Sequence, residues 1–390
     1  MKKILIINKS FETGGIQSSM VNMANALAEY CQVDLFLYNP QGPMKERLDS
    51  RVRILPTSWR FQAIGMTVKQ AAASKDIRII SYRLFAALWT KLFSNKLPIS
   101  RAIGHQARMS GYDLAIAFHQ EQRKKAVLSG FTRVADQMTD AKVKIAWIHF
   151  DSATLDLDSA YNEPFYGKMD KIVCVSRSLM ESFRKAHPSL ADRVDYCYNF
   201  MDYSRILSQS GQPQQREYPA DRFICFSACR LSKEKALPRA VRALAPVLRA
   251  NPDVLWYIAG SGPERKAIEQ TIEEEELSDR IILLDNQPNP YPYMKNADLV
   301  MNVSYHEAAP MVFMEARALG KPVFATKTSS AMELLHDDVD AFVCENTWEG
   351  ILSRFSELMA DRGKVERAGE AMSRQSASNQ GSLEKTLSFL

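Results

Sequence analysis

The sequence feature that most constrains the fold is a series of short apolar segments, connected by helical patterns, that occurs twice along the chain. Segments of roughly four to eight residues rich in Val, Ile and Leu are typical of buried parallel strands. The first series comprises 3–8, 33–38, 52–56, 113–118, 144–150, 171–176 and 194–199, and the second 223–229, 254–260, 281–284, 297–304 and 322–326. Strands that alternate with helices predict an α/β fold, and two such series predict two Rossmann-like domains.

The length of the chain agrees with two domains, because 390 residues exceed one ordinary domain and suffice for two of roughly 150 to 200 residues. Residues 204–218 are rich in Gln, Ser and Pro and separate the two series. We therefore predict an amino-terminal domain over 1–203 and a linker over 204–219. A carboxyl-terminal domain over 220–365 and a helical tail over 366–390 complete the prediction.

Composition narrows the class of protein. Hydrophobic residues make up 46% and charged residues 24%, as in globular proteins. No apolar run reaches the 18 or so residues of a membrane span, and the apolar core of the first ten residues is too short for a signal peptide. The six cysteines include no Cys-x-x-Cys pair, so we expect core thiols in a reducing cytoplasm.

Charged residues follow two strands of the second domain. Arg230 and Lys235 come just after strand 223–229, where two cations suit a diphosphate that gains negative charge as a sugar leaves. Glu307 follows strand 297–304, and Glu315 lies in the helix that ends at Gly320. Both carboxylates are expected to point into the crevice at the carboxyl end of the strand. Alternatively, Glu307 is an exposed loop charge and Glu315 belongs to a solvated helix face.

Two glycines follow the first strand of the first domain, and two more follow the second strand of the second domain. Gly14 and Gly15 lie between strand 3–8 and a helix, and Gly260 and Gly262 occur in the sequence AGSGPE after strand 254–260. Glycine lets the backbone approach a phosphate or a sugar closely. The fingerprint G-x-G-x-x-G is absent, which argues against a nicotinamide site. A plain strand-to-helix turn explains Gly14 and Gly15 about equally well.

A basic segment spans residues 60–108. It contains nine cations and one acid, Asp76, interleaved with aromatic residues in a helical rhythm; the cations are Arg60, Lys69, Lys75, Arg78, Arg83, Lys91, Lys96, Arg101 and Arg108. Such helices are attracted to anionic lipid by roughly 1 kcal/mol per basic residue. Either this segment contacts an anionic membrane, or its apolar side packs on the sheet and its basic side is solvated. The net charge of +5 and the absence of a nucleic-acid-binding signature argue against nucleic acid.

The order of these motifs resembles that of the retaining glycosyltransferases of family 4, which have the GT-B fold: two Rossmann-like domains facing each other across a cleft. The resemblance is strongest over 223–345. It implies that Arg230 and Lys235 bind the leaving diphosphate, Glu315 holds the ribose, and Glu307 and His149 touch the donor sugar. It further assigns to the donor site the backbone groups of Gly14, Gly15, Gly260, Gly262, Asn286, Gln287, Pro288, Ala309, Pro310 and Met311.

The sequence departs from the family pattern at several positions. Cys229, Ala236 and Ala308 replace glycines that are usual in the family, which puts the geometry of those loops in doubt. Asp156 and Asp158 match the metal-binding Asp-x-Asp of another glycosyltransferase class, but they follow no strand. We therefore expect no metal and no cofactor apart from the donor substrate.

The resemblance implies transfer of a sugar, with retention, from a nucleoside diphosphate sugar to a glycan or a lipid-linked glycan in cell-surface polysaccharide biosynthesis. We expect a UDP-sugar donor, and a location in the cytoplasm or on the inner face of the cytoplasmic membrane. Two alternatives remain. One is a nucleotide-sugar epimerase of the same fold, and the other is a non-catalytic member that binds nucleotide-sugar or acts as a scaffold.

Overall fold

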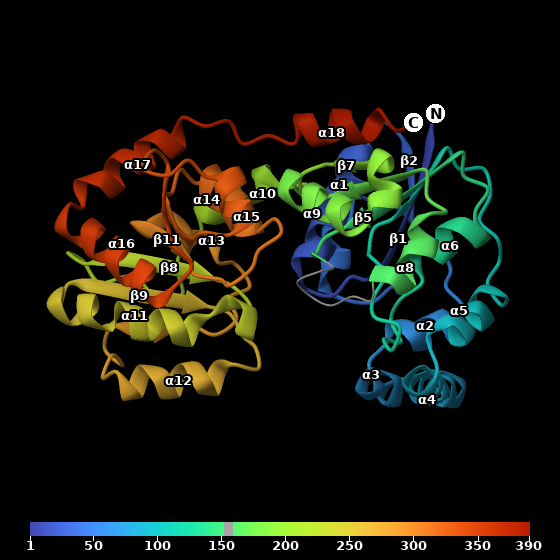
Figure 1. The fold of residues 1–390 in the computed structure, drawn as a ribbon, viewed down its shortest axis with the longest axis horizontal. Coiled ribbons are helices and arrows are strands. Elements are labelled where there is room, and N and C mark those ends of the chain that lie inside the picture. Colours follow the sequence, from blue (N-terminus) through green and yellow to red (C-terminus); the bar gives the residue numbers. More distant parts are fainter. Residues whose placement is uncertain (152–158) are drawn as a thin grey trace. The chain divides into compact units, whose positions relative to one another are not determined.

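The computed structural model describes residues 1–151 and 159–390, and these form two compact units. The first unit comprises Met1–Met201 and Asn379–Leu390, and the second comprises Asp202–Ser378. Each unit contains one parallel sheet with helices packed against it (Figure 1). The predicted α/β class with two Rossmann-like domains is therefore confirmed.

The first unit is built on a seven-stranded sheet of order β3-β2-β1-β4-β5-β6-β7, in which every pairing is parallel. Its strands are β1 (Lys3–Ser10), β2 (Gln32–Asn39), β3 (Arg53–Ile54), β4 (Leu114–Ala117), β5 (Val143–Ile148), β6 (Lys171–Cys174) and β7 (Val194–Tyr196). Strands β1 and β4 are buried on both faces, which explains their nearly continuous apolar sequences.

The first unit also contains helices. They are α1 (Gly15–Leu27), α2 (Trp59–Gly65), α3 (Val68–Ala73), α4 (Ile77–Leu92), α5 (Lys96–Ile103), α6 (Phe131–Met138), α8 (Ser159–Tyr166), α9 (Arg177–Ala186) and α18 (Gln380–Leu387). Helix α2 packs on the sheet through Phe61, whose ring lies edge-on to Phe36 at 5.3 Å between centroids. Helices α3 and α4 are seen at the lower edge of this unit in Figure 1.

The second unit is built on a six-stranded parallel sheet of order β10-β9-β8-β11-β12-β13. Its strands are β8 (Phe223–Ala228), β9 (Val254–Ala259), β10 (Ile281–Leu283), β11 (Leu299–Asn302), β12 (Val323–Thr326) and β13 (Ala341–Cys344). Its helices are α10 (Tyr203–Ser210), α11 (Leu237–Ala250), α12 (Arg265–Glu274), α13 (Tyr291–Asn296), α14 (Met311–Ala318), α15 (Ser329–Leu334), α16 (Trp348–Ala360) and α17 (Gly363–Ser373).

Strand β8 shows how the two-residue period of a strand builds the core. Phe223 and Cys225 point to the face covered by α11, α12 and α16. Phe226 points to the opposite face, where its ring stacks on Tyr293 of α13 at 6.1 Å. Both faces of β8 are therefore buried, and burial of a large apolar side chain contributes roughly 1.5–3 kcal/mol. The core fixes the carboxyl end of β8, from which the loop with Arg230 starts.

The unit boundary differs from the predicted linker and tail. Residues 203–210 form α10 of the second unit, because the Asp202 carboxylate caps the helix by accepting from the Arg205 amide at 3.0 Å, and Ile206 is buried. The Gln, Ser and Pro content of residues 204–218 is typical of a linker, which is why the sequence did not predict this helix. Within the predicted tail, α17 belongs to the second unit and α18 to the first.

Long and apolar helices were sought as possible membrane spans. Throughout the two described stretches, 1–151 and 159–390, no helix combines the length and the apolar character that crossing a membrane requires.

Two glycines let two loops of the second unit pack backbone to backbone. Gly260 has φ of 151°, and a Cβ atom placed on it would lie 1.8 Å from the carbonyl oxygen of Cys229. A Cβ on Gly262 would lie 2.2 Å from the carbonyl oxygen of Leu231. Because both positions are glycine, the loops come close enough for the Leu231 amide to donate to the Ser261 carbonyl at 2.9 Å. The AGSGPE loop therefore buttresses the loop that carries Arg230.

We predict that Gly260→Ala destabilises the protein by about 1 to 3 kcal/mol, because either the Cys229 carbonyl or the glycine loop must shift. Urea unfolding followed by tryptophan fluorescence measures this change. Gly369→Ala is the matched control in the same unit, because it lies inside α17 with only ordinary contacts around its Cβ position. The control should be neutral or stabilising by about 0.5–1 kcal/mol. Equal effects of the two variants would contradict this explanation.

Candidate functional site

The candidate site lies at the carboxyl edge of the second sheet. The chain proceeds from β8 to β9 and β10 on one side, and from β11 to β12 and β13 on the other, so the strand order reverses between β8 and β11. Open α/β sheets bind ligands at such a switch point. Arg230 and Lys235 follow β8, and Glu307 follows β11. The predicted charged residues therefore flank the switch point of this sheet.

Lys235 and Glu307 form an ion pair across the switch point. Lys235 Nζ lies 2.5 Å from Glu307 Oε1, and both side chains are mostly buried, with exposed fractions of 20% and 11%. The same oxygen accepts from Ser304 Oγ at 2.7 Å and from Asn302 Nδ2 at 3.3 Å. Oε2 accepts no hydrogen bond from any of the described residues. Glu307 is thus held in one orientation with one oxygen left for a ligand.

The loops that carry this pair are tied to each other. The backbone amide of Tyr305 donates to the Glu234 carbonyl at 2.8 Å. Arg239 of α11 donates to the Val303 carbonyl at 3.0 Å, and its guanidinium lies 4.1 Å from the centroid of the Tyr305 ring. These contacts fix the distance between Lys235 and Glu307 without using either side chain.

Electrostatics keep Lys235 protonated. Burial opposes the charged form of the amine, but the charge and the hydrogen bond of Glu307 outweigh it, so that the pKa of Lys235 is raised. Lys235 is therefore a cation at neutral pH.

Arg230 differs from Lys235 in its surroundings. Its side chain is exposed, and it makes no hydrogen bond or ion pair with the part of the chain that the structure describes. Cys229 precedes it, and burial raises the pKa of this thiol to about 11, so that no thiolate repels an anion here. Arg230 thus offers a full positive charge at the switch point.

Ala236 takes a backbone conformation that favours glycine. Its φ and ψ are 52° and 26°, and it ends the short 3-10 helix Lys233–Lys235 before α11 begins. An L-residue in this left-handed region costs roughly 1–2 kcal/mol. Alanine therefore preserves the turn that glycine usually makes here, but at an energetic cost.

Glu315 lies on the helix that follows Glu307 in the chain. It is half-buried on α14, and its Oε1 accepts from the Tyr291 hydroxyl at 3.2 Å. Pro310 is the N-cap rather than the first residue of this helix, and Met311 is the first. After Ala318 the helix ends, and Gly320 has φ of 64°, which confirms the predicted stop. Ala309 lies in the loop between Glu307 and the helix.

The loop with the predicted donor-site residues Asn286, Gln287 and Pro288 follows β10. Asn286 and Pro288 are exposed, whereas the Gln287 side chain turns back and donates to the Leu284 carbonyl. Gly260 and Gly262 face the loop of Arg230, as described above. Contacts of all these residues with a nucleotide stay a prediction.

The first unit places its predicted residues at its own switch point, between β1 and β4. Gly14 is the N-cap of α1 and Gly15 its first residue, and no side chain of the described residues caps this helix. Its first amides are therefore suited to an anion. The predicted donor contacts of Gly14 and Gly15 are untested.

His149 follows β5 and is 5% exposed. Its Nε2 lies 2.8 Å from the Phe118 carbonyl oxygen, so this nitrogen carries the proton, and the Gln120 side chain accepts from the His149 amide at 2.8 Å. Burial, and then the charge of His119, lower the pKa of His149 to about 3. His149 is therefore neutral at physiological pH, and its contact with a donor sugar stays a prediction. Asp156 and Asp158 lie outside the described residues.

Sequence reasoning missed the residues that orient the predicted ones. Asn302 and Ser304 hold Glu307, Tyr291 holds Glu315, and Arg239 holds the loop that precedes Glu307. A signal was present for Asn302 and Ser304, because polar residues at the end of a buried apolar strand lie at the ligand-binding edge of a parallel sheet. Tyr291 and Arg239 carry no comparable signal.

Comparison with known proteins identifies the second unit. Residues 209–375, which cover most of the second unit, match the family model described as glycosyl transferases group 1. The second unit is a glycosyl transferases group 1 domain. The Lys235–Glu307 pair and Arg230 all lie inside this group 1 domain.

The chain is similar to curated bacterial proteins. The chain is 25% identical over 254 residues to N-acetyl-alpha-D-glucosaminyl L-malate synthase of Bacillus anthracis, covering 62% of this chain and 66% of that protein. It is 30% identical over 184 residues to the lipopolysaccharide core biosynthesis glycosyltransferase LpsD of Rhizobium meliloti, covering 46% and 50%. The chain thus spans about half to two thirds of the length of these curated relatives.

The fold extends over the whole chain. The structure of HepE from Anabaena in complex with UDP-glucose superposes with a TM-score of 0.70 at 18% identity and covers 100% of both chains. This likeness confirms the GT-B type of fold, in which each of two Rossmann-like domains has its own parallel sheet.

We predict that protonation of buried histidines weakens the fold in acid. The folded-state pKa of His149 is about 3 and that of His119 about 4, both below the ordinary value of about 6.5. The unfolded chain therefore binds these protons first. The contribution of the two neutral histidines to the free energy of unfolding is fully present above about pH 6.5 and decreases as the pH drops toward 4. Each histidine contributes up to about 1.4 kcal/mol per pH unit.

Urea unfolding between pH 7 and pH 4, followed by tryptophan fluorescence, checks this expectation. His149→Gln should reduce the slope of the free energy of unfolding against pH by the amount that one proton contributes. His306→Gln, at an exposed position, should leave this slope unchanged. A dependence that both variants leave at the wild-type slope would refute the neutral, buried state of His149.

Proposed function

We propose that this protein is a glycosyltransferase that moves a sugar from a nucleoside diphosphate sugar to a growing glycan or lipid-linked oligosaccharide in cell-surface polysaccharide biosynthesis. One observation carries the proposal. At the switch point of a group 1 domain, the Lys235–Glu307 ion pair lies in the same loops as the exposed cation Arg230. Two cations beside one oriented carboxylate suit the transfer of a group away from a diphosphate.

The proposed roles follow from charge. When the bond between the anomeric carbon and the diphosphate oxygen breaks, the diphosphate gains negative charge, which Arg230 and Lys235 stabilise. Glu307 positions the donor sugar through its second oxygen, and Glu315 holds the ribose hydroxyls. The configuration is retained because the acceptor approaches from the side on which the phosphate leaves, and this phosphate takes the acceptor proton.

Uridine diphosphate is the proposed carrier, and the chemistry is proposed to proceed without a metal. Support for UDP comes from HepE, a protein of the same fold whose structure contains UDP-glucose. The two cations of the switch point supply positive charge of the kind that a divalent metal supplies in other transferases.

The acceptor side of the proposal concerns the first unit. The relative named for lipopolysaccharide core biosynthesis supports a cell-surface glycan or glycolipid as acceptor. Leu84, Leu88 and Leu92 are exposed along α4 within the basic segment 60–108, which supports peripheral contact with an anionic membrane. We place the protein in the cytoplasm, at the inner face of the cytoplasmic membrane.

A non-catalytic, nucleotide-sugar-binding protein is the second candidate function. Two observations favour it: Ala236 occupies a left-handed position, and Lys235 is neutralised by Glu307. Such a protein would bind the nucleotide but would not cleave a sugar from it.

We predict that UDP stabilises the purified protein more than GDP or ADP does, with EDTA present throughout. A ligand at 100 times its dissociation constant adds about 2.7 kcal/mol to the free energy of unfolding. Arg230→Gln should weaken UDP binding by about 10- to 100-fold, because a hydrogen bond to a charged group is lost. Thermal shift and titration calorimetry measure these effects.

Arg222→Gln is the matched control, because Arg222 is exposed at the opposite end of the same strand, β8. This variant should bind UDP as the wild type does. The proposal loses its basis if none of the three nucleotides shifts the melting temperature, or if the two arginine variants weaken binding equally.

A further inference from the structure

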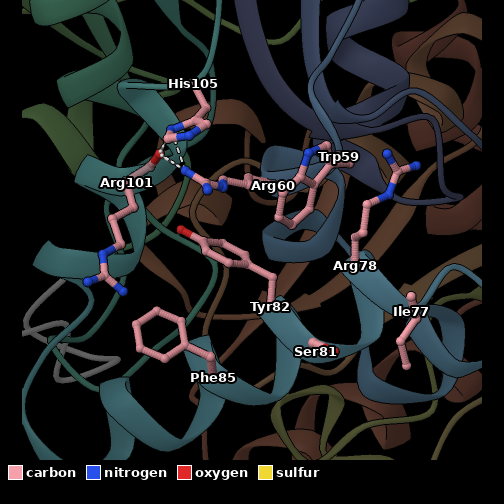
Figure 2. A pocket seen from close by; sticks show the side chains of 9 residues that line it. All are labelled: Trp59, Arg60, Ile77, Arg78, Ser81, Tyr82, Phe85, Arg101 and His105. Atoms are coloured by element: carbon pink, nitrogen blue, oxygen red, sulfur yellow. Dashed lines mark hydrogen bonds between the residues drawn. The ribbon is translucent and has the colours of Figure 1, made fainter.

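The first unit contains a pocket that the proposed donor chemistry does not use. It has a volume of about 600 Å³ and lies between α2, α4 and α5 (Figure 2). Helix α2 follows β3, and α3 is tied to the loop after β1 by a hydrogen bond from Gln70 to Glu12. The pocket therefore belongs to the helices near the carboxyl ends of the strands, where α/β proteins bind ligands.

One wall of the pocket is aromatic. Trp59 lies edge-on to Tyr82 at 5.6 Å, and Tyr82 lies 5.7 Å from Phe85. The Tyr82 hydroxyl donates to the Pro98 carbonyl at 2.6 Å, and burial raises the pKa of Tyr82 to about 12. The phenol is therefore neutral and satisfied, and its ring offers an apolar surface.

The pocket also carries uncompensated positive charge. The guanidinium of Arg60 lies 5.0 Å from the centroid of Trp59, and that of Arg101 lies 5.2 Å from the centroid of Phe85 (Figure 2). Among the residues that the structure describes, no Asp or Glu lines the pocket. Asp76 is the single acid of residues 60–108, and it pairs with Arg78 at 2.8 Å.

Arg60 and Arg101 form no ion pair with any carboxylate in the described ranges 1–151 and 159–390. Arg60 instead contacts His105 and the Arg101 carbonyl. Both cations therefore line the cavity without a carboxylate partner, and a bound anion would supply the counter-charge. Guanidinium groups bind phosphate through paired hydrogen bonds.

An apolar stripe continues from the pocket along α4. Ile77 and Ser81 line the pocket, and Leu84, Leu88 and Leu92 follow on the same helix face at spacings of three and four residues. These leucines are exposed, Leu88 by 63%. A ligand with a charged head in the pocket can therefore lay an apolar chain along this stripe.

We propose that this pocket binds the phosphate group of an amphipathic phosphate ester, with Arg60 and Arg101 on the phosphate and its apolar chain on the aromatic wall and the leucine stripe. Two guanidinium groups match the double charge of a phosphate or diphosphate better than the single charge of a carboxylate. The inference rests on the proposed function in one respect, because it names the ligand as the lipid-phosphate part of the acceptor.

Calorimetric titration with farnesyl diphosphate tests the pocket, using the full chain with saturating UDP so that the proposed donor site is filled. We expect binding to the wild type, weakened at least about tenfold in Arg60→Gln and in Arg101→Gln. Arg101 is exposed, so its replacement leaves the fold intact even if Arg60→Gln fails to fold. Arg108→Gln, in the same basic segment but outside the pocket, should bind as the wild type does.

Two further probes separate the sources of phosphate. Inorganic pyrophosphate should bind more weakly than farnesyl diphosphate, since it lacks the apolar chain; equal affinity would overturn the amphipathic part of the inference. Vesicles of phosphatidylglycerol test a membrane surface instead. If they bind in an Arg101-dependent way and farnesyl diphosphate does not, the pocket is a membrane contact and the inference is wrong.

Failure of the inference and failure of the proposed function give different results. UDP binding without farnesyl diphosphate binding refutes the pocket alone, whereas farnesyl diphosphate binding without UDP binding refutes the donor site alone. Equal binding by the wild type, Arg60→Gln and Arg101→Gln also overturns the pocket assignment.

Discussion

The strand order of the second unit is the constraint on which the candidate site depends. Because the order reverses between β8 and β11, the loops after these two strands lie side by side at one edge of the sheet. Lys235 and Glu307 meet there at 2.5 Å, although 72 residues separate them in the sequence. A buried ion pair is a weak source of stability, since removing two charges from water offsets most of their attraction. Its position at the ligand-binding edge is therefore better explained by function.

The supports of this pair are apolar packing and backbone contacts rather than further charges. The core around β8 fixes the end of the strand, Gly260 and Gly262 let the neighbouring loop pack against it, and Arg239 holds the facing loop. Ala236 shows that the arrangement is maintained at a cost, because its left-handed conformation opposes it by roughly 1–2 kcal/mol. The first unit has a different character: leucines are exposed along α4, and the nearby Arg60 and Arg101 have no carboxylate partner among the described residues.

Much of the fold could be predicted from the sequence, because parallel strands buried on both faces leave nearly continuous apolar runs. The positions of Arg230, Lys235 and Glu307 after strands were predictable for the same reason. Their pairing was not, since it depends on strand order, which local patterns do not encode. Composition misled at residues 203–210, where a segment rich in Ser forms a helix that Asp202 caps. The glycines of AGSGPE were predicted to approach a nucleotide, and the structure adds a second reason for them, the approach of the Cys229 and Leu231 carbonyls.

The most direct test of the central claim is the release of UDP from UDP-hexoses by the wild type, by Glu307→Gln and by Glu345→Gln. Glu345 is the matched control, because it follows β13 of the same sheet and pairs with Lys327 at 2.7 Å. The account predicts release by the wild type and by Glu345→Gln, and at least about a 100-fold loss in Glu307→Gln with UDP binding retained. Wild-type release by Glu307→Gln, or a wild type that binds UDP and cleaves none of the UDP-hexoses, would contradict it.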